Sequence, residues 1–191
     1  YIALFYISHL EALKLNLTDH NTAVGHDAMI VTTTGAENTA IGNNALDAST
    51  TASNNTAVGY HGLLANTTGT YNTAVGARTL SSNLTGVRNV AVGYSALESN
   101  NSTNGGSYNV GVGFAALCVN QASSNVAIGY QALKGQVEGN RNVAIGKGAM
   151  GLADGSGSND SGDNTFIGYL AGGGAWADAA STKNVGIGNY V

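Results

Sequence analysis

The sequence predicts an all-β chain, a parallel β-solenoid (β-roll) of about ten coils with a period of about 17 residues. The first observation is a string that occurs ten times: Asn, any residue, a third residue that is small in nine copies, Val or Ile, and Gly. The second is its spacing, because the first four intervals are identical and some later ones are lengthened by inserted loops. A period held over so many copies is typical of stacked coils. The strings begin at Asn21, Asn38, Asn55, Asn72, Asn89, Asn109, Asn125, Asn142, Asn164 and Asn184.

Within one coil, side-chain alternation assigns the residues to two faces. In the copy that begins at Asn55, Thr56 and Val58 lie on one face and Ala57 on the other. We expect Val or Ile at the fourth position to form the core, with the Thr or Val of the second position also facing inward. Gly at the fifth position allows the chain to turn. The predicted core row includes Val58, Val75, Val92, Ile128 and Ile145.

A second element follows each string at a fixed offset. It is a small residue and then Leu or Met, as in Ala45-Leu46 and Ala132-Leu133. We expect it to form a second short strand whose Leu or Met packs back on the Val and Ile row.

Two further rows follow from stacking equal positions. The leading Asn side chains should form a ladder in which each amide bonds to the coils above and below. Ala or Gly fills the third position in nine copies, with Phe166 as the exception. This small-residue face suits either the opposite wall of a thin solenoid or neighbouring chains. The predicted ladder includes Asn55, Asn72, Asn89, Asn125 and Asn142.

An aromatic residue recurs directly after the Gly of the string. These residues either stack on one another and support the turn, or they form a carbohydrate-binding stripe. The row is Tyr60, Tyr94, Phe114, Tyr130 and Tyr169.

The two ends suggest assembly. Residues 1–20 should hold an apolar strand and a degenerate cap coil, because Glu11 to Lys14 resembles Gln131 to Lys134, and residues 21–191 form the solenoid. The last copy stops halfway through a coil, so the apolar N-terminal strand of one subunit could complete the C-terminal coil of the next. The alternative is a self-folded cap. The assembly candidates are Tyr1, Ile2, Leu4, Phe5, Ile7, Ile187, Tyr190 and Val191.

Composition argues against several functions. Charged residues make up 9% of the chain, its formal charge is -4 and its Lys and Arg are scattered, which disfavours nucleic-acid binding. No run approaches the roughly 18 apolar residues of a membrane span. The single cysteine excludes an intrachain disulfide. A loop with Asp154, Asp160 and Asp163 is a weak calcium candidate, and otherwise we expect no metal or cofactor.

Catalysis is not expected. The acids lie mostly in variable loops, no two stack in register, and the four histidines lack metal spacing. Sequons such as those at Asn66, Asn83 and Asn100 would be surface positions if the chain is glycosylated. Ice binding by a Thr row is disfavoured, because the replacement of Thr by Val in later copies suggests that this row faces the core.

The strings Asn55-Thr-Ala-Val-Gly-Tyr60 and Asn89-Val-Ala-Val-Gly-Tyr-Ser-Ala-Leu97 resemble the head repeats of trimeric autotransporter adhesins and related phage tail-fibre repeats. The resemblance covers about Asn21 to Val191. It implies a left-handed parallel β-roll, usually a three-chain bundle on a cell or virion surface, with adhesion as the common role. The period of this chain is longer than the adhesin coil, and a filament of single chains remains an alternative.

We therefore expect a structural subunit of an extracellular or cell-surface or virion-surface fibre that assembles with itself, as a filament or homotrimer. The alternative is an adhesin head or tail-fibre module that binds host glycan or protein. Its contacts would come from loops at Glu98 to Tyr108 and Gly151 to Asp163, and from single aromatic residues. The candidate contact residues are Tyr60, Tyr94, Tyr130 and Trp176.

Overall fold

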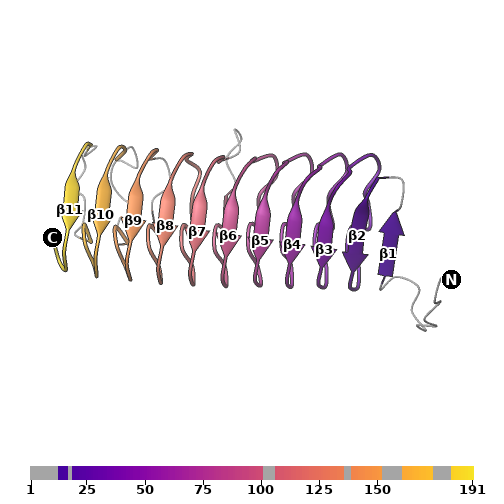
Figure 1. Cartoon of the computed structure of the whole chain (residues 1–191), viewed down its shortest axis with the longest axis horizontal. Helices are drawn as coiled ribbons and strands as arrows, with labels where there is room; N and C mark the ends of the chain where they lie inside the picture. The colour runs from indigo at the N-terminus through magenta and orange to yellow at the C-terminus, as the bar shows by residue number, and fades with distance from the viewer. Residues whose placement is uncertain (1–12, 17–18, 101–105, 136–138, 152–160, 174–181) are drawn as a thin grey trace.

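The computed structural model describes residues 13–16, 19–100, 106–135, 139–151, 161–173 and 182–191. Its eleven strands form one sheet in sequence order and stand side by side along a rod (Figure 1). Strands β2 to β11 are parallel, and each contains part of one Asn-starting string. The predicted all-β parallel solenoid is confirmed. The strands are β1 (Leu13–Asn16), β2 (Asn21–Val24), β3 (Thr39–Ile41), β4 (Thr56–Val58), β5 (Thr73–Val75), β6 (Val90–Val92), β7 (Val110–Val112), β8 (Val126–Ile128), β9 (Val143–Ile145), β10 (Thr165–Ile167) and β11 (Val185–Ile187).

Each strand stacks on the same residues of its neighbour. Thr56 pairs with Thr73 and Val58 pairs with Val75, and this register holds from β2 to β11. Because neighbouring strands lie about 4.8 Å apart, equal positions of successive coils form rows along the rod. Positions are counted below from the leading Asn of each coil, which is position one.

Gly at position five ends each strand. Its φ lies between 126° and 139° in all ten coils, a conformation that only glycine adopts readily. In nine coils a Cβ at this Gly would come within 2.6 Å of the carbonyl oxygen of the next coil's Gly. The predicted role of this Gly in the turn is confirmed, and it also allows the coils to approach one another.

The core lies on the opposite face of the sheet from the predicted one. Ala57, Ala74, Ala91 and Ala127 at position three are fully buried, and they pack in one cluster with the Leu and Met of position nine. The Val and Ile of position four, predicted as the core, point outward and are half-exposed. The space between the two walls of a coil holds one Leu or Met, so only a small side chain fits opposite it. The wrongly placed residues are Val58, Val75, Val92, Ile128 and Ile145.

Position two was also expected to face inward, and this expectation is wrong for the same reason. Thr56 and Thr73 lie on the outer face beside the residues of position four, and neither is buried. The replacement of Thr by Val in later coils therefore changes the outer surface of the rod and leaves its core unchanged.

The same burial decides between the two interpretations of the small-residue face. The small-residue face packs against the opposite wall of a thin solenoid, which contributes the Leu or Met of position nine, and it does not receive a neighbouring chain. Phe166 occupies this position in β10 and is also buried.

The predicted second strand of each coil does not form in the described residues. The segment around position nine is a turn, because the Leu or Met there has φ between 49° and 53° in eight coils. Its backbone still bonds to the next coil, as in Leu63 N–H to the Thr79 carbonyl at 3.0 Å and Ala65 N–H to the Ser81 carbonyl at 3.0 Å. The predicted burial of this Leu or Met is confirmed.

The N-terminal cap differs from a degenerate coil. β1 pairs antiparallel with β2, with Leu13 opposite Val24 and Asn16 opposite Asn21. A further coil would have paired in parallel, so the expectation of a zeroth coil is wrong for these four residues. The chain itself thus covers the edge of β2, which favours the self-folded cap.

Candidate interaction surfaces

A buried Asn ladder holds the coils in register. The backbone N–H of each leading Asn donates to the Oδ1 of the preceding one at 2.8–3.0 Å, from Asn21 to Asn184 without a break. The Nδ2 atom then bonds within the same coil, as from Asn72 to the Gly86 carbonyl at 2.8 Å. The predicted ladder at Asn55, Asn72, Asn89, Asn125 and Asn142 is present.

A second Asn ladder was missed in the sequence. The Nδ2 atoms of Asn83, Asn100 and Asn120 donate to the Oδ1 of the preceding ladder Asn at 2.9–3.0 Å, beginning from Asn66. A signal was available, because Asn recurs eleven positions after the leading Asn in four consecutive copies. All four side chains are buried. The sequons at Asn66, Asn83 and Asn100 are therefore not surface positions.

The outer sheet face consists of positions two and four of β2 to β11. It carries only Thr and Val at position two and only Val and Ile at position four, so none of its own side chains is charged. Val24, Ile41, Val75 and Ile128 are 37–41% exposed. Position four is therefore an uninterrupted apolar row on the surface, and exposed apolar patches are candidates for interaction surfaces.

The aromatic row lies along one edge of the rod. Tyr94, Phe114 and Tyr130 stack with ring centroids 5.4 and 5.2 Å apart, so the predicted stacking is confirmed for these three. Tyr60 instead stacks on its neighbour His61 at 3.7 Å. Because stacked rings cover one another's faces, Phe114 in particular offers a ligand only its edge. That arrangement disfavours a sugar stacked flat on the row.

One cation, the Lys147 ammonium group, lies beside the aromatic row at its C-terminal end. Lys147 Nζ lies 5.7 Å from the ring centroids of both Tyr130 and Tyr169. Such cation–π contacts are worth roughly 0.5–1 kcal/mol at exposed sites. The main role of the aromatic row is therefore to hold the turns of neighbouring coils together.

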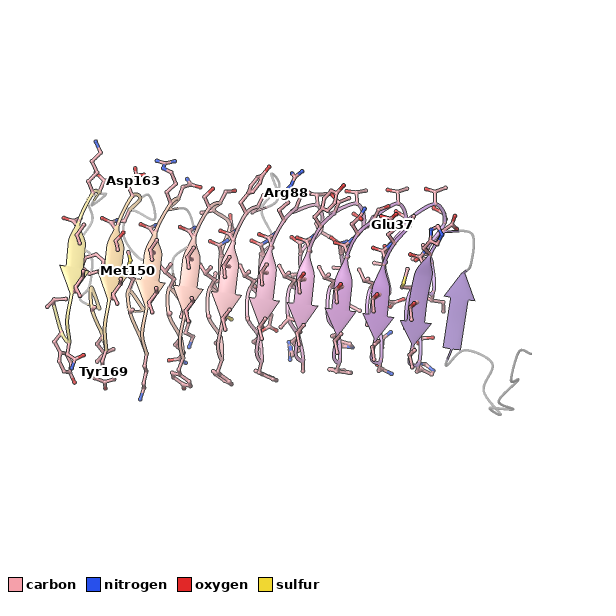
Figure 2. All side chains as sticks on the ribbon, in the orientation of Figure 1. Glu37, Arg88, Met150, Asp163 and Tyr169 are labelled. Carbon is pink, nitrogen blue, oxygen red and sulfur yellow. The ribbon has the colours of Figure 1, made fainter. Side chains whose placement is uncertain are left out.

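Further charged side chains lie at the opposite edge. In Figure 2, Glu37, Arg88 and Asp163 lie along this edge, Tyr169 lies on the other edge and Met150 lies between the two. Arg88 sits over the rings of Tyr71 and Tyr108, 5.2 and 5.5 Å from their centroids.

Asp163, one of the calcium candidates, has a different partner. Arg141 Nη2 donates to its Oδ2 at 2.9 Å, and this hydrogen bond lowers the pKa of Asp163. Asp154 and Asp160 lie outside the described residues. Among the residues that are described, no group of His, Cys, Asp and Glu side chains is placed to hold a metal ion.

The assembly candidates are only partly described. Tyr1, Ile2, Leu4, Phe5 and Ile7 lie outside the described residues, as does Trp176. The side chains of Ile187 in β11 and of Tyr190 and Val191 after it are exposed. Tyr190 meets Tyr169 edge to face at 5.3 Å, and a hydrogen bond with Tyr169 raises the pKa of Tyr190.

These features define the chain as a β-solenoid repeat protein whose coils are joined by buried amide ladders. In the described part of the chain, no helix is long and apolar enough to cross a membrane. No family model, curated protein or solved structure matches it.

Proposed function

We propose that the chain is a structural subunit of an extracellular or surface fibre, in which it serves as a stiff rod that associates with further copies of itself. The observation that carries the proposal is the unbroken leading-Asn ladder. Nine consecutive junctions use the same hydrogen bond, and the bond is buried in eight of them, in spite of inserted loops between coils. A rod that keeps one register over its whole length suits a load-bearing or spacing role.

The coils of a solenoid make contacts in one direction only, along the rod. Each coil bonds only to its neighbours, so the rod's stiffness is set by how well each junction resists shear and bending. Buried amide bonds on one side and close Gly contacts at the turn hold both sides of every junction. We propose neither catalysis nor a cofactor for this rod.

Self-association is supported by the outer sheet face. From β6 to β9 both of its rows are apolar, which suits packing against the same face of another copy. Sheet faces pack about 10 Å apart with interdigitated side chains, and β-branched residues lose little freedom when they are covered. The residues of this apolar half are Val90, Val110, Val126, Val143, Val92, Val112, Ile128 and Ile145.

End-to-end joining is the other route of assembly. It would use the exposed side chains of β11 together with Tyr1 to Ile7. Side-by-side packing would bury the apolar half, whereas end-to-end joining would leave it in water.

The second candidate function is adhesion, as an adhesin head or tail-fibre module. It is favoured by the exposure of Tyr60, Tyr94 and Tyr130 on one edge of the rod. Binding to a glycan array that is lost in Tyr60→Ala or Tyr130→Ala would support adhesion over a purely structural role.

Electron microscopy and light scattering of the purified protein test the structural proposal. We expect rods or bundles with the mass of several chains, and we expect Ile128→Lys to reduce that mass. Thr51→Lys, an exposed position outside the sheet face, is the matched control. A monomer at all concentrations would contradict self-association. Assemblies that persist in Ile128→Lys but fall apart without residues 1–10 would assign assembly to the ends.

A further inference from the structure

The first four coils differ on the outer sheet face from the four coils that follow them. Position two is Thr from β2 to β5, and position four is Val or Ile. These coils follow one another at a constant interval without insertion, and their register is the same at every pair. They therefore form two straight parallel rows, called here the Thr–Val face. The Thr–Val face consists of Thr22, Thr39, Thr56, Thr73, Val24, Ile41, Val58 and Val75.

The hydroxyl groups of the Thr–Val face are not used by the protein. Among the described residues, the side chains of Thr22, Thr39, Thr56 and Thr73 have no hydrogen-bond partner. Some Thr hydroxyls elsewhere in the same coils do have partners. Thr50 Oγ1 donates to the Thr67 carbonyl at 3.2 Å, and Thr67 Oγ1 donates to the Leu84 carbonyl at 3.1 Å. The sheet-face hydroxyls are left to bond water.

The spacing of these groups is regular in two directions. Neighbouring strands repeat at about 4.8 Å, and alternate residues along a strand are about 6.7 Å apart. β-branched side chains are restricted at χ1, so their methyl and hydroxyl groups hold fixed positions. The Ala of position three keeps its side chain inside the coil, so nothing interrupts the two rows.

We infer that the Thr–Val face binds ice. Position two of β2 to β5 faces outward and not toward the core, so the reason for disfavouring ice binding does not hold. A small ligand would use one or two coils, whereas a crystal surface repeats as the face does and can meet every coil at once.

The chemistry of the eight side chains suits ordered water. Methyl groups favour water arranged in cages around them, and the free hydroxyls anchor that water at regular intervals. Charged side chains, which hold water in their own hydration shells, are absent from these eight positions. Repetition gives the interaction its strength, because each added coil contributes without a further cost of orienting the protein.

The test measures thermal hysteresis and the shape of ice crystals grown in solutions of the full chain. We expect faceted crystals and a gap between the melting and freezing temperatures. Thr56→Lys should reduce this gap at least tenfold. Thr51→Lys, which places the same charge off the sheet face, should leave the gap unchanged. Circular dichroism of both variants shows whether they remain folded. Unfaceted crystals and no gap from the folded wild-type chain would overturn the inference.

Burial by a second copy is the competing explanation of the face. Thr56→Cys, reacted with a thiol reagent and weighed by mass spectrometry, shows whether the face is open. Labelling of this thiol in the native protein is expected. A protected thiol in an oligomer would overturn ice binding and assign the face to self-association. Self-association itself is tested at Ile128 in the other half, so either proposal can fail alone.

Discussion

Phe166 and Gly172 together fill the space that Ala and Leu fill in other coils. Phe166 occupies position three, where most coils have Ala, and Gly172 occupies position nine, where most have Leu or Met. A Cβ on Gly172 would lie 2.7 Å from Phe166 Cγ. The ring therefore crosses from the sheet into the volume of the missing Leu. Gly186 in the next coil is also required, because its Cβ would lie 2.6 Å from the same ring.

This relationship predicts compensation between two positions. Gly172→Leu alone should destabilise the chain by about 1–3 kcal/mol through overpacking, and Phe166→Ala alone by about 3–5 kcal/mol through the cavity it leaves. The double variant restores the usual pair and should lie close to wild type. Gly172 has φ 62°, close to that of the Leu residues it replaces, so the backbone accepts the change. Urea unfolding of the four proteins gives the coupling energy, and strictly additive losses would contradict the shared volume.

The second Asn ladder stops at Ser49, whose buried Oγ has no partner. Asn at this position could bond to Asn66, but residue 52 is Ala. In the next coil the equivalent residue is Gly69, where a Cβ would clash with Asn66 Oδ1. Ser49→Asn alone should therefore destabilise the chain.

Ser49→Asn combined with Ala52→Gly should extend the ladder by one coil. We expect a favourable coupling of about 1–3 kcal/mol between the two changes, measured by denaturant unfolding of the double-mutant cycle. Ala52→Gly alone is the control and should cost about 0.5–1 kcal/mol. No coupling would mean that the ladder does not form at residue 49.

Two glycines, at positions five and three of neighbouring coils, should respond differently to substitution by Ala. Gly93 has φ 126°, and its Cβ would meet the Gly113 carbonyl oxygen at 2.5 Å. Gly93→Ala should cost more than about 2 kcal/mol. Gly111 occupies the usual Ala position, and its Cβ would have no neighbour closer than 3.3 Å. Gly111→Ala should change the free energy of unfolding by less than about 1 kcal/mol. Equal effects of the two substitutions on the melting temperature would contradict this distinction.

The leading Asn ladder predicts a large cost for losing one member. Asn72→Ala leaves the Asn89 N–H without its acceptor. It also removes one of the two amide donors to the Gly86 carbonyl, which keeps its hydrogen bond from Asn83. A buried unsatisfied group costs about 1–3 kcal/mol, so the loss of stability should be about 1–3 kcal/mol. Asn43→Ala, at an exposed turn position, should have little effect. A loss at Asn72 no larger than the loss at Asn43 would show that water replaces the ladder bonds.

The Arg141–Asp163 pair predicts a titration shift. The hydrogen bond from Arg141 holds the pKa of Asp163 below its ordinary value of 3.8. The pair therefore contributes to stability above that ordinary value, and the contribution is lost as pH falls through the lowered pKa. Arg141→Gln should move the pKa of Asp163 back toward its ordinary value, which carbon-detected NMR of the carboxyl group measures. An unchanged titration would mean that the pair does not form in solution.

Much of the rod could be predicted from particular residues. The leading Asn and the Gly at position five recur together, and each has one physical use in a stacked coil. The Leu or Met at position nine was rightly placed in the core but wrongly placed on a strand. Bulky residues rarely adopt positive φ, so the sequence contains no signal for the turn that Leu63 and its equivalents make.

The sequence by itself determined the period, the stacking of equal positions and the leading amide ladder, because each follows from one residue type repeated at one interval. Only the tertiary structure decided which face of the sheet is inside. Alternation along a strand separates two faces but does not say which one is buried. Here the opposite wall contributes one Leu or Met to each coil, and the narrow space left beside it accepts Ala57 but not Val58. The larger β-branched residues are therefore on the outside, where they form the outer sheet face.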